Sequence, residues 1–106
     1  MRKLILLPLT LVALGFGAAS VAPAASTVRL KDDYFSPKST SVAKNTTVTF
    51  RWAGKSAHNL LVSSGPAKFS VSPRTKGTYR RKFTRKGTYR LVCSLHSGMT
   101  MKLRVR

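Results

Sequence analysis

The sequence predicts an all-β fold, a sandwich of about seven to eight short strands. Apolar and polar residues alternate along several short segments, as they do in strands that bury one face. Residues that favour turns occupy the gaps between these segments, and no segment has a convincing amphipathic helix pattern. At 106 residues the chain has room for one domain, and we find no linker or second domain in it.

The strongest strand pattern lies at Thr47–Trp52, where Val48, Phe50 and Trp52 fall on one face of the strand. The first segment is shorter and alternates in the same way around Leu30. The expected strands, in order along the chain, are Thr27–Lys31, Ser39–Ala43, Thr47–Trp52, His58–Val62, Tyr79–Thr84, Thr88–Cys93 and Met101–Arg106.

The gaps between the expected strands contain residues that tolerate tight or left-handed backbone. These turn sites are Asp32-Asp33, Ser36-Pro37, Lys44-Asn45, Ala53-Gly54, Ser63–Pro66 and Lys86-Gly87. The segment Ser63–Arg74 has the weakest pattern. We expect it to be either a long loop or a loop that contains a short strand.

A short repeat lies in the second half of the chain, where residues 76–80 (KGTYR) return as residues 86–90. A single repeat of this length suggests a hairpin, because a solenoid needs several units. In the strand that follows the first copy, alternation places Arg81 on the same face as Tyr79 and Phe83. We therefore expect a bulge or an edge position there, or an Arg81 side chain that reaches solvent along its long stem.

The first 25 residues have the composition of a secretory signal peptide. Arg2 and Lys3 form a basic start, residues 4–21 carry no charge, and Ala22-Pro23-Ala24 supplies small residues for cleavage. We expect residues 1–25 to be removed and residues 26–106 to fold in the periplasm or outside the cell, with no membrane span. The alternative is a retained membrane anchor, because the uncharged run approaches the ~20 residues that span a bilayer.

The chain is extremely basic, with 20 Lys and Arg residues against only Asp32 and Asp33 and a formal net charge of +18. Such a charge predicts attraction to acidic proteins, anionic lipid or nucleic acid, and it says little about the fold. Binding of a polyanion is therefore one alternative function. Export and the scarcity of exposed aromatic motifs argue against nucleic acid as the partner.

The single cysteine of the chain, Cys93, cannot form an intramolecular disulfide in an oxidising compartment. It begins the run CSLHSGM at residues 93–99, which places a thiolate, the imidazole of His96 and the thioether of Met99 in one short loop. Alternation along the preceding strand points the Cys93 sulfur into the interior. His58 is the only other histidine.

Two histidines, a cysteine and a methionine form the donor set of a blue-copper electron-transfer site. The soft thiolate and thioether favour copper over hard cations, whereas a structural zinc site more often uses several cysteines. A Cys/His protease is disfavoured because Cys93 and His96 lie on one short loop without an obvious orienting partner. The residues thus predict a copper site rather than an enzyme.

These residues together resemble the cupredoxin family, the group of plastocyanin, amicyanin and pseudoazurin, over essentially all of Thr27–Arg106. The resemblance implies an antiparallel Greek-key β-sandwich with one copper ion per chain near one end, cycling between Cu(I) and Cu(II) as a one-electron carrier. It also implies that Asn59 ties the His58 loop to the Cys93 loop. The motifs that carry the resemblance are Phe35-Ser36-Pro37, Val48-Thr49-Phe50, His58-Asn59, Gly87-Thr88-Tyr89 and Cys93-x-x-His96.

Two methionines compete for the axial ligand position. Met99 fits the short loop that resembles amicyanin, and Met101 fits the longer spacing found in plastocyanin and pseudoazurin. Counting from Met99 places Leu103 and Val105 at the apolar positions of the last strand, whereas counting from Met101 leaves that strand too short. We therefore expect Met99 to be the axial ligand, with Met101 as the alternative and core packing as its other role.

The resemblance further implies that His96 is the ligand nearest the surface and the route for electrons. The basic charge then suits an acidic redox partner protein, and a monomer is favoured. An exported copper carrier or buffer would use the same ligands and is the main alternative to electron transfer.

Overall fold

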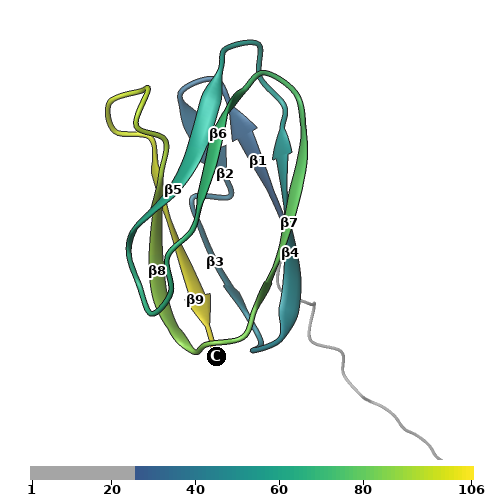
Figure 1. The fold of residues 1–106 in the computed structure, drawn as a ribbon, viewed down its shortest axis with the longest axis vertical. Helices are drawn as coiled ribbons and strands as arrows, with labels where there is room; N and C mark the ends of the chain where they lie inside the picture. The colour runs from purple at the N-terminus through teal and green to yellow at the C-terminus, as the bar shows by residue number, and fades with distance from the viewer. Residues whose placement is uncertain (1–25) are drawn as a thin grey trace, which may run out of the picture.

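The computed structural model describes residues 26–106, which fold into nine β-strands and no helix. The strands form two sheets that pack face to face, as Figure 1 shows. The all-β sandwich is therefore confirmed, with slightly more strands than expected. In chain order the strands are β1 (Thr27–Lys31), β2 (Tyr34–Ser36), β3 (Ser39–Val42), β4 (Thr46–Trp52), β5 (His58–Ser64), β6 (Ser70–Arg74), β7 (Gly77–Phe83), β8 (Gly87–Val92) and β9 (Thr100–Val105).

The two sheets are mixed rather than wholly antiparallel. The strand order is β2-β1-β4-β7 in one sheet and β3-β9-β8-β5-β6 in the other. β1 runs parallel to β4, and β3 runs parallel to β9, while the other neighbours pair antiparallel. The parallel neighbours come from strands far apart along the chain, because the chain crosses repeatedly from one sheet to the other.

Two of the nine strands lie outside the seven expected segments. β2 has three residues, too few for an alternating pattern to be visible, and it pairs with β1 across the Asp32-Asp33 turn. Ser63–Arg74 was expected to be a long loop or a loop with a short strand, and the structure has the short strand, β6. β6 pairs with β5 at the edge of its sheet. The pairing of β5 with β6 contains a register shift, which weakens the sequence pattern there.

The prediction that the KGTYR repeat forms a hairpin is wrong. β7 pairs with β4 in one sheet, whereas β8 pairs with β5 and β9 in the other. The two copies of the repeat therefore begin strands in different sheets, and the connection between them crosses the sandwich. A local repeat specifies two similar strand starts, but it does not specify which sheet each strand joins.

The core fills the space between the sheets with residues from alternate positions of the strands. In β4 the side chains of Val48, Phe50 and Trp52 are buried while Thr47 and Arg51 are exposed, as alternation predicts. Rings from both sheets meet in this core, with Phe83 packed edge-on against Tyr89 at a centroid distance of 5.1 Å. The full buried set is Val28, Leu30, Phe35, Val42, Val48, Phe50, Trp52, Leu60, Val62, Val71, Phe83, Tyr89, Leu91, Cys93, Met99, Met101, Leu103 and Val105.

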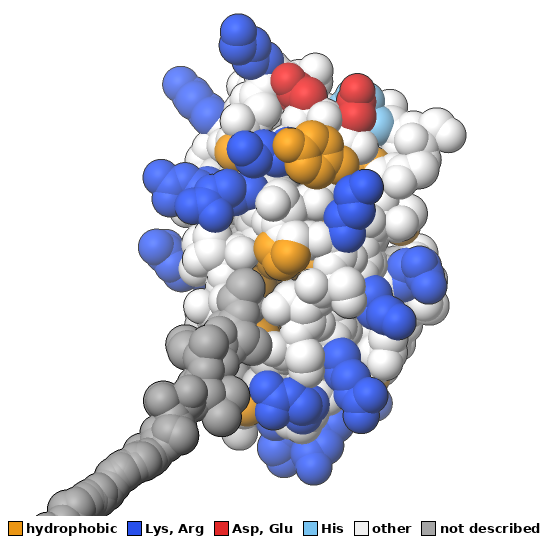
Figure 2. Space-filling view, turned by 180° about the vertical axis from the view of Figure 1, so that it is seen from behind, with side chains coloured by type: hydrophobic (Ala, Val, Ile, Leu, Met, Phe, Trp, Pro, Cys, Tyr) orange, Lys and Arg blue, Asp and Glu red, His pale blue; other side chains and the backbone are white. Residues whose placement is uncertain are grey.

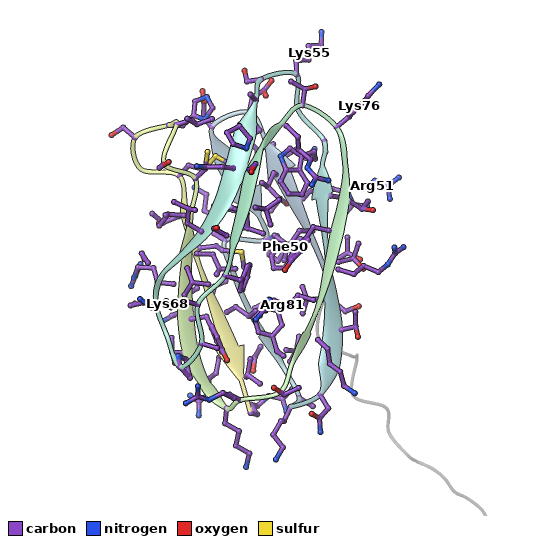
Figure 3. All side chains as sticks on the ribbon, in the orientation of Figure 1. Phe50, Arg51, Lys55, Lys68, Lys76 and Arg81 are labelled. Atoms are coloured by element: carbon purple, nitrogen blue, oxygen red, sulfur yellow. The ribbon has the colours of Figure 1, made fainter. Side chains whose placement is uncertain are left out.

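Arg81 lies in β7, an edge strand of its sheet. The pairing of β7 with β4 runs from Thr46 to Trp52 without a register shift, so the position has no bulge. The Arg81 guanidinium stacks 4.3 Å from the Phe69 ring centroid and donates a hydrogen bond to the Tyr79 hydroxyl. Figure 3 shows Arg81 and Phe50 in the middle of the sandwich, whereas Lys76 points into solvent. Edge placement and a cation–π contact thus accommodate a charge on the inward face.

The predicted signal peptide, residues 1–25, lies outside the described residues. Within residues 26–106, the structure has no helix of the length and apolar character that crossing a membrane requires.

Candidate metal centre

The two histidines and the cysteine meet at one end of the sandwich. His58 is the first residue of β5, and Cys93 follows directly after β8. His96 lies in the loop that joins β8 to β9. Since β5 and β8 are antiparallel neighbours, the start of one strand lies beside the end of the other, which brings His58 to the Cys93 loop.

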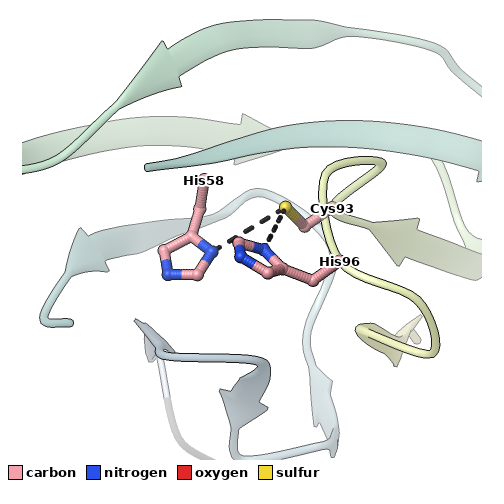
Figure 4. A group of neighbouring side chains, drawn as sticks. All are labelled: His58, Cys93 and His96. Atoms are coloured by element: carbon pink, nitrogen blue, oxygen red, sulfur yellow. Dashed lines mark hydrogen bonds between the residues drawn. The ribbon is translucent and has the colours of Figure 1, made fainter. Parts of the chain in front are cut away.

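The three donor atoms converge, as Figure 4 shows. The Cys93 Sγ lies 3.8 Å from Nδ1 of His58 and 3.6 Å from Nδ1 of His96. All three atoms lie within 4.8 Å of one another, and the ring centroids of the histidines are 4.7 Å apart. Both imidazoles therefore turn the same nitrogen toward the sulfur.

Backbone hydrogen bonds close the loop between β8 and β9. The Cys93 N–H donates to the Met99 carbonyl at 3.0 Å, and the Met99 N–H donates to the His96 carbonyl at 3.2 Å. Gly98 adopts a φ of 77°, a left-handed conformation that glycine adopts without steric cost. The loop is thus a tight turn that holds Cys93 beside Met99.

Both candidate axial methionines are buried, with 1% of Met99 and 2% of Met101 exposed. Met101 lies opposite Leu91 in the pairing of β8 with β9. The hydrogen bond from Cys93 to Met99 continues this pairing, so Met99 lies directly across from Cys93. Met101 is one inward-facing position deeper, about 7 Å along the strand.

His58 is hydrogen-bonded through its backbone to a side chain from the opposite sheet. Its side chain is completely buried, and its carbonyl accepts a hydrogen bond from Nε1 of Trp52 at 2.7 Å. This bond links β4 of one sheet to β5 of the other. It fixes the start of β5 where the two sheets meet.

Asn59 bridges the His58 strand and the Cys93 loop with two hydrogen bonds. Its Nδ2 donates to the Ser94 hydroxyl, and its Oδ1 accepts from the Ser94 N–H, both at 2.8 Å. Only 8% of Asn59 is exposed. Asn59 follows His58 and Ser94 follows Cys93, so these two bonds fix the separation of His58 and Cys93.

Asp32, a turn residue by its sequence position, contacts the site. Its Oδ1 accepts hydrogen bonds from the N–H groups of Ser56 and Lys55, each at 2.9 Å, and lies 3.4 Å from Nε2 of His58. The Ser56 N–H bond, together with Lys55 and His58, holds the pKa of the Asp32 carboxyl below its usual value despite desolvation. A Cβ at Gly54 would collide with this carboxylate, so glycine lets the loop close over it.

Asp33 approaches the second histidine, with its Oδ1 3.5 Å from Nε2 of His96. Figure 2 shows the acidic side chains gathered beside histidine at one end of an otherwise basic surface. Asp32 and Asp33 stand out in the sequence because they are its only acidic residues. Their partners are far away along the chain, so no local pattern could assign them.

The donor set fits copper. A single buried cysteine sulfur and two imidazole nitrogens on a rigid scaffold are the donor types of the trigonal group in a blue-copper site. His58 is fully enclosed, whereas 24% of the His96 side chain is exposed. The site is therefore enclosed on one side and reaches the surface through His96.

Comparisons with known proteins agree with this geometry. The family model described as copper binding proteins, plastocyanin/azurin family, matches residues 24–106. No curated protein sequence matches significantly. A reduced Cu(I) form of an amicyanin variant is 28% identical, with a TM-score of 0.64 over 86% of this chain and 90% of that chain.

Two further solved structures share the fold. A purple cupredoxin from Nitrosopumilus maritimus has a TM-score of 0.67 at 20% identity, over 76% of this chain and 99% of that chain. A copper-containing nitrite reductase from Thermus scotoductus SA-01 has a TM-score of 0.67 at 28% identity over 90% of this chain, which spans only 25% of the reductase. With the family model matched over the whole described domain, the chain belongs to the plastocyanin/azurin family of copper-binding proteins.

Proposed function

We propose that this chain is an exported type 1 blue-copper protein that carries single electrons. The observation that carries the proposal is the convergence of His58, Cys93 and His96 at the end of a rigid sandwich, with both Nδ1 atoms facing the sulfur. These residues would hold one copper ion, which supplies the Cu(I)/Cu(II) couple. The protein would supply a fixed set of ligands, so that little rearrangement accompanies the change of charge.

Met99 is the axial ligand in this proposal. The hydrogen bond from Cys93 to Met99 makes the two residues cross-strand neighbours, and such pairs bring their Cβ atoms to about 5 Å of one another. Met101 instead packs in the core opposite Leu91. The register therefore favours Met99 over the alternative Met101.

The His96 side chain is 24% exposed, whereas that of His58 is fully buried, so His96 would offer the route between a bound copper and a partner. Among residues 26–106, the two large apolar side chains with high exposure are Leu95 at 48% and Tyr34 at 45%, the chain neighbours of His96 and of Asp33 beside it. They would form an apolar contact around the exposed edge of His96. A partner that docks there would lie against the exposed edge of the His96 imidazole.

The basic charge favours an acidic redox partner protein. With 20 Lys and Arg residues against two acids, the chain should attract an oppositely charged partner from a distance, and salt should weaken that attraction. Stopped-flow association rates with an acidic electron-transfer protein should therefore fall as salt rises. Rates that do not depend on salt would rule steering out.

We propose that the chain is not an enzyme and acts as a monomer. The nitrite reductase similarity covers a quarter of that protein, and its activity belongs to the whole protein. We also propose that residues 1–25 are a signal peptide and residues 26–106 the mature copper domain in the periplasm or outside the cell. The family match begins at residue 24, which supports that boundary.

A copper carrier or buffer remains the competing function, because it would use the same ligands. The burial of His58 and Cys93 favours slow release of the metal. The decisive experiment compares the rate at which a strong chelator removes copper with the rate of electron self-exchange between oxidised and reduced protein. Slow removal with fast self-exchange supports an electron carrier, and the reverse contradicts it.

A further inference from the structure

The two acidic residues of the chain both face site histidines. Asp32 Oδ1 lies 3.4 Å from Nε2 of the buried His58, and Asp33 Oδ1 lies 3.5 Å from Nε2 of His96. The chain has 20 Lys and Arg residues, and they provide no comparable pairing with these acids in the described structure. The only negative side chains thus contact histidine rather than the many cations around them.

The two nitrogens of each imidazole face different groups. Nδ1 of both rings faces the Cys93 sulfur, and Nε2 of both rings faces a carboxylate. A neutral imidazole has one N–H donor and one lone pair. Because an ionised carboxylate only accepts hydrogen bonds, it favours the proton on Nε2 and leaves the Nδ1 lone pair directed at the sulfur.

We infer that Asp32 and Asp33 are positioning residues that orient His58 and His96 for copper and stabilise the Cu(II) state over Cu(I). This inference rests on the proposed copper function. Carboxylates that accept from the second nitrogen of a ligating histidine fix its ring orientation and raise its basicity. Their negative charge favours the more highly charged metal state, which lowers the reduction potential.

The two carboxylates differ in how firmly they are held. Asp32 accepts two backbone N–H bonds from the loop before β5, and 44% of its side chain is exposed. Asp33 has no such backbone support in the described structure, and 72% of its side chain is exposed. Solvent screens exposed charges, so Asp32 has the larger effect and Asp33 the smaller.

The test uses Asp32→Asn and Asp33→Asn in the full chain. Asparagine keeps the side-chain shape and an acceptor oxygen for Ser56 and Lys55, and it tolerates the left-handed φ of 72° at Asp33. The control is Thr84→Lys, which adds the same unit of positive charge at an exposed turn at the other end of the sandwich. Chelator competition measures the affinities for Cu(II) and Cu(I), and voltammetry measures the potential.

We expect Asp32→Asn to weaken Cu(II) binding about 10- to 100-fold, and Asp33→Asn to weaken it less, with smaller losses for Cu(I). Each tenfold difference between the two losses raises the reduction potential by about 59 mV. Thr84→Lys leaves both affinities unchanged. In proton NMR spectra of the copper-free wild type, the Nε2–H signals lie downfield, and each moves upfield in the matching variant.

Asparagine variants that match Thr84→Lys in potential and in both affinities would overturn the inference. So would an Asp32→Asn variant that lowers only the unfolding midpoint of the copper-free protein, because that result describes an anchor for the loop alone. Failure of the proposed function would look different, since wild-type protein would then show no thiolate–copper absorption. The Nε2–H signals would still report on the two carboxylates in that case.

Discussion

The two ends of the sandwich have opposite characters. One end carries the donor residues, both acids and the two exposed large apolar side chains. At the other end, the β7–β8 turn and the end of β9 form a pocket lined by cations, including Lys86, Arg104 and Arg106. Figure 2 shows the acids at one end only, whereas Lys and Arg are spread over the whole face and also cover the opposite end. The donor residues and both acids thus share one end, whereas the positive charge extends over the whole described domain (Figure 2 and Figure 3).

The largest effect is expected from Cys93→Ser, which should abolish copper–thiolate chemistry at the site end and leave the rest of the sandwich intact. A serine hydroxyl cannot replace the thiolate as a soft donor, so the intense thiolate–copper absorption should be lost completely. The rest of the sandwich should still form, and far-ultraviolet circular dichroism should match that of the wild type. A variant that keeps the absorption band would show that the sulfur of Cys93 is not a ligand.

Phe83→Ala should destabilise the packing away from the site without changing the chemistry of the site. The side chain is 1% exposed and packs against Tyr89 and Phe50, so its loss should destabilise the copper-free protein by about 3–5 kcal/mol in urea unfolding. Where the variant is folded, its copper spectrum should equal that of the wild type. The control is Tyr34→Ala at the site end, which removes an exposed ring and should cost about 0.5 kcal/mol or less.

Asn59→Ala should produce an intermediate loss that couples stability to the site. Removing the amide leaves the Ser94 N–H and hydroxyl without their partner, which should cost about 1–3 kcal/mol and loosen the Cys93 loop. Faster removal of copper by a chelator measures the loosening. Ser63→Ala is the matched control, because it removes an exposed hydrogen bond from β5 to β8 that does not involve the Cys93 loop. Equal effects of the two changes would contradict the bridging role.

The smallest change is expected at the axial position. Met99→Leu should keep the thiolate absorption and raise the reduction potential, because a hydrocarbon supports the higher copper charge less well than a thioether. Met101→Leu changes only core packing, so voltammetry should find a smaller shift. A larger shift for Met101→Leu would reverse the assignment of the axial ligand.

Strong alternation made most of the fold predictable. Segments such as Thr46–Trp52 bury every second residue, and that period appears directly in the sequence. β2 was missed because three residues show no period, and the irregular register of β5 with β6 blurred the pattern before Arg74. Neither the parallel pairs nor the separation of β7 and β8 into different sheets follows from local sequence, because both depend on the path of the whole chain.

The sequence identified residues that meet in the structure, including Asn59 as the link between the two loops, but it did not identify the contacts of the two acids. His58, Cys93 and His96 are rare residue types in a recognisable arrangement, and the structure brings them together. Asp32 and Asp33 occupy a turn, a position that their residue type alone explains. Their contacts with the two histidines arise only when the β1–β2 turn lies beside the starts and ends of other strands.

The most direct test of the central claim is the response of the purified wild-type chain to Cu(II), followed by visible and electron paramagnetic resonance spectroscopy. We predict an intense blue thiolate band that saturates at one copper per chain, together with the resonance of a copper–thiolate centre. A chain that binds no copper, or binds it without a thiolate signal, would contradict the claim that these donors form a blue-copper site.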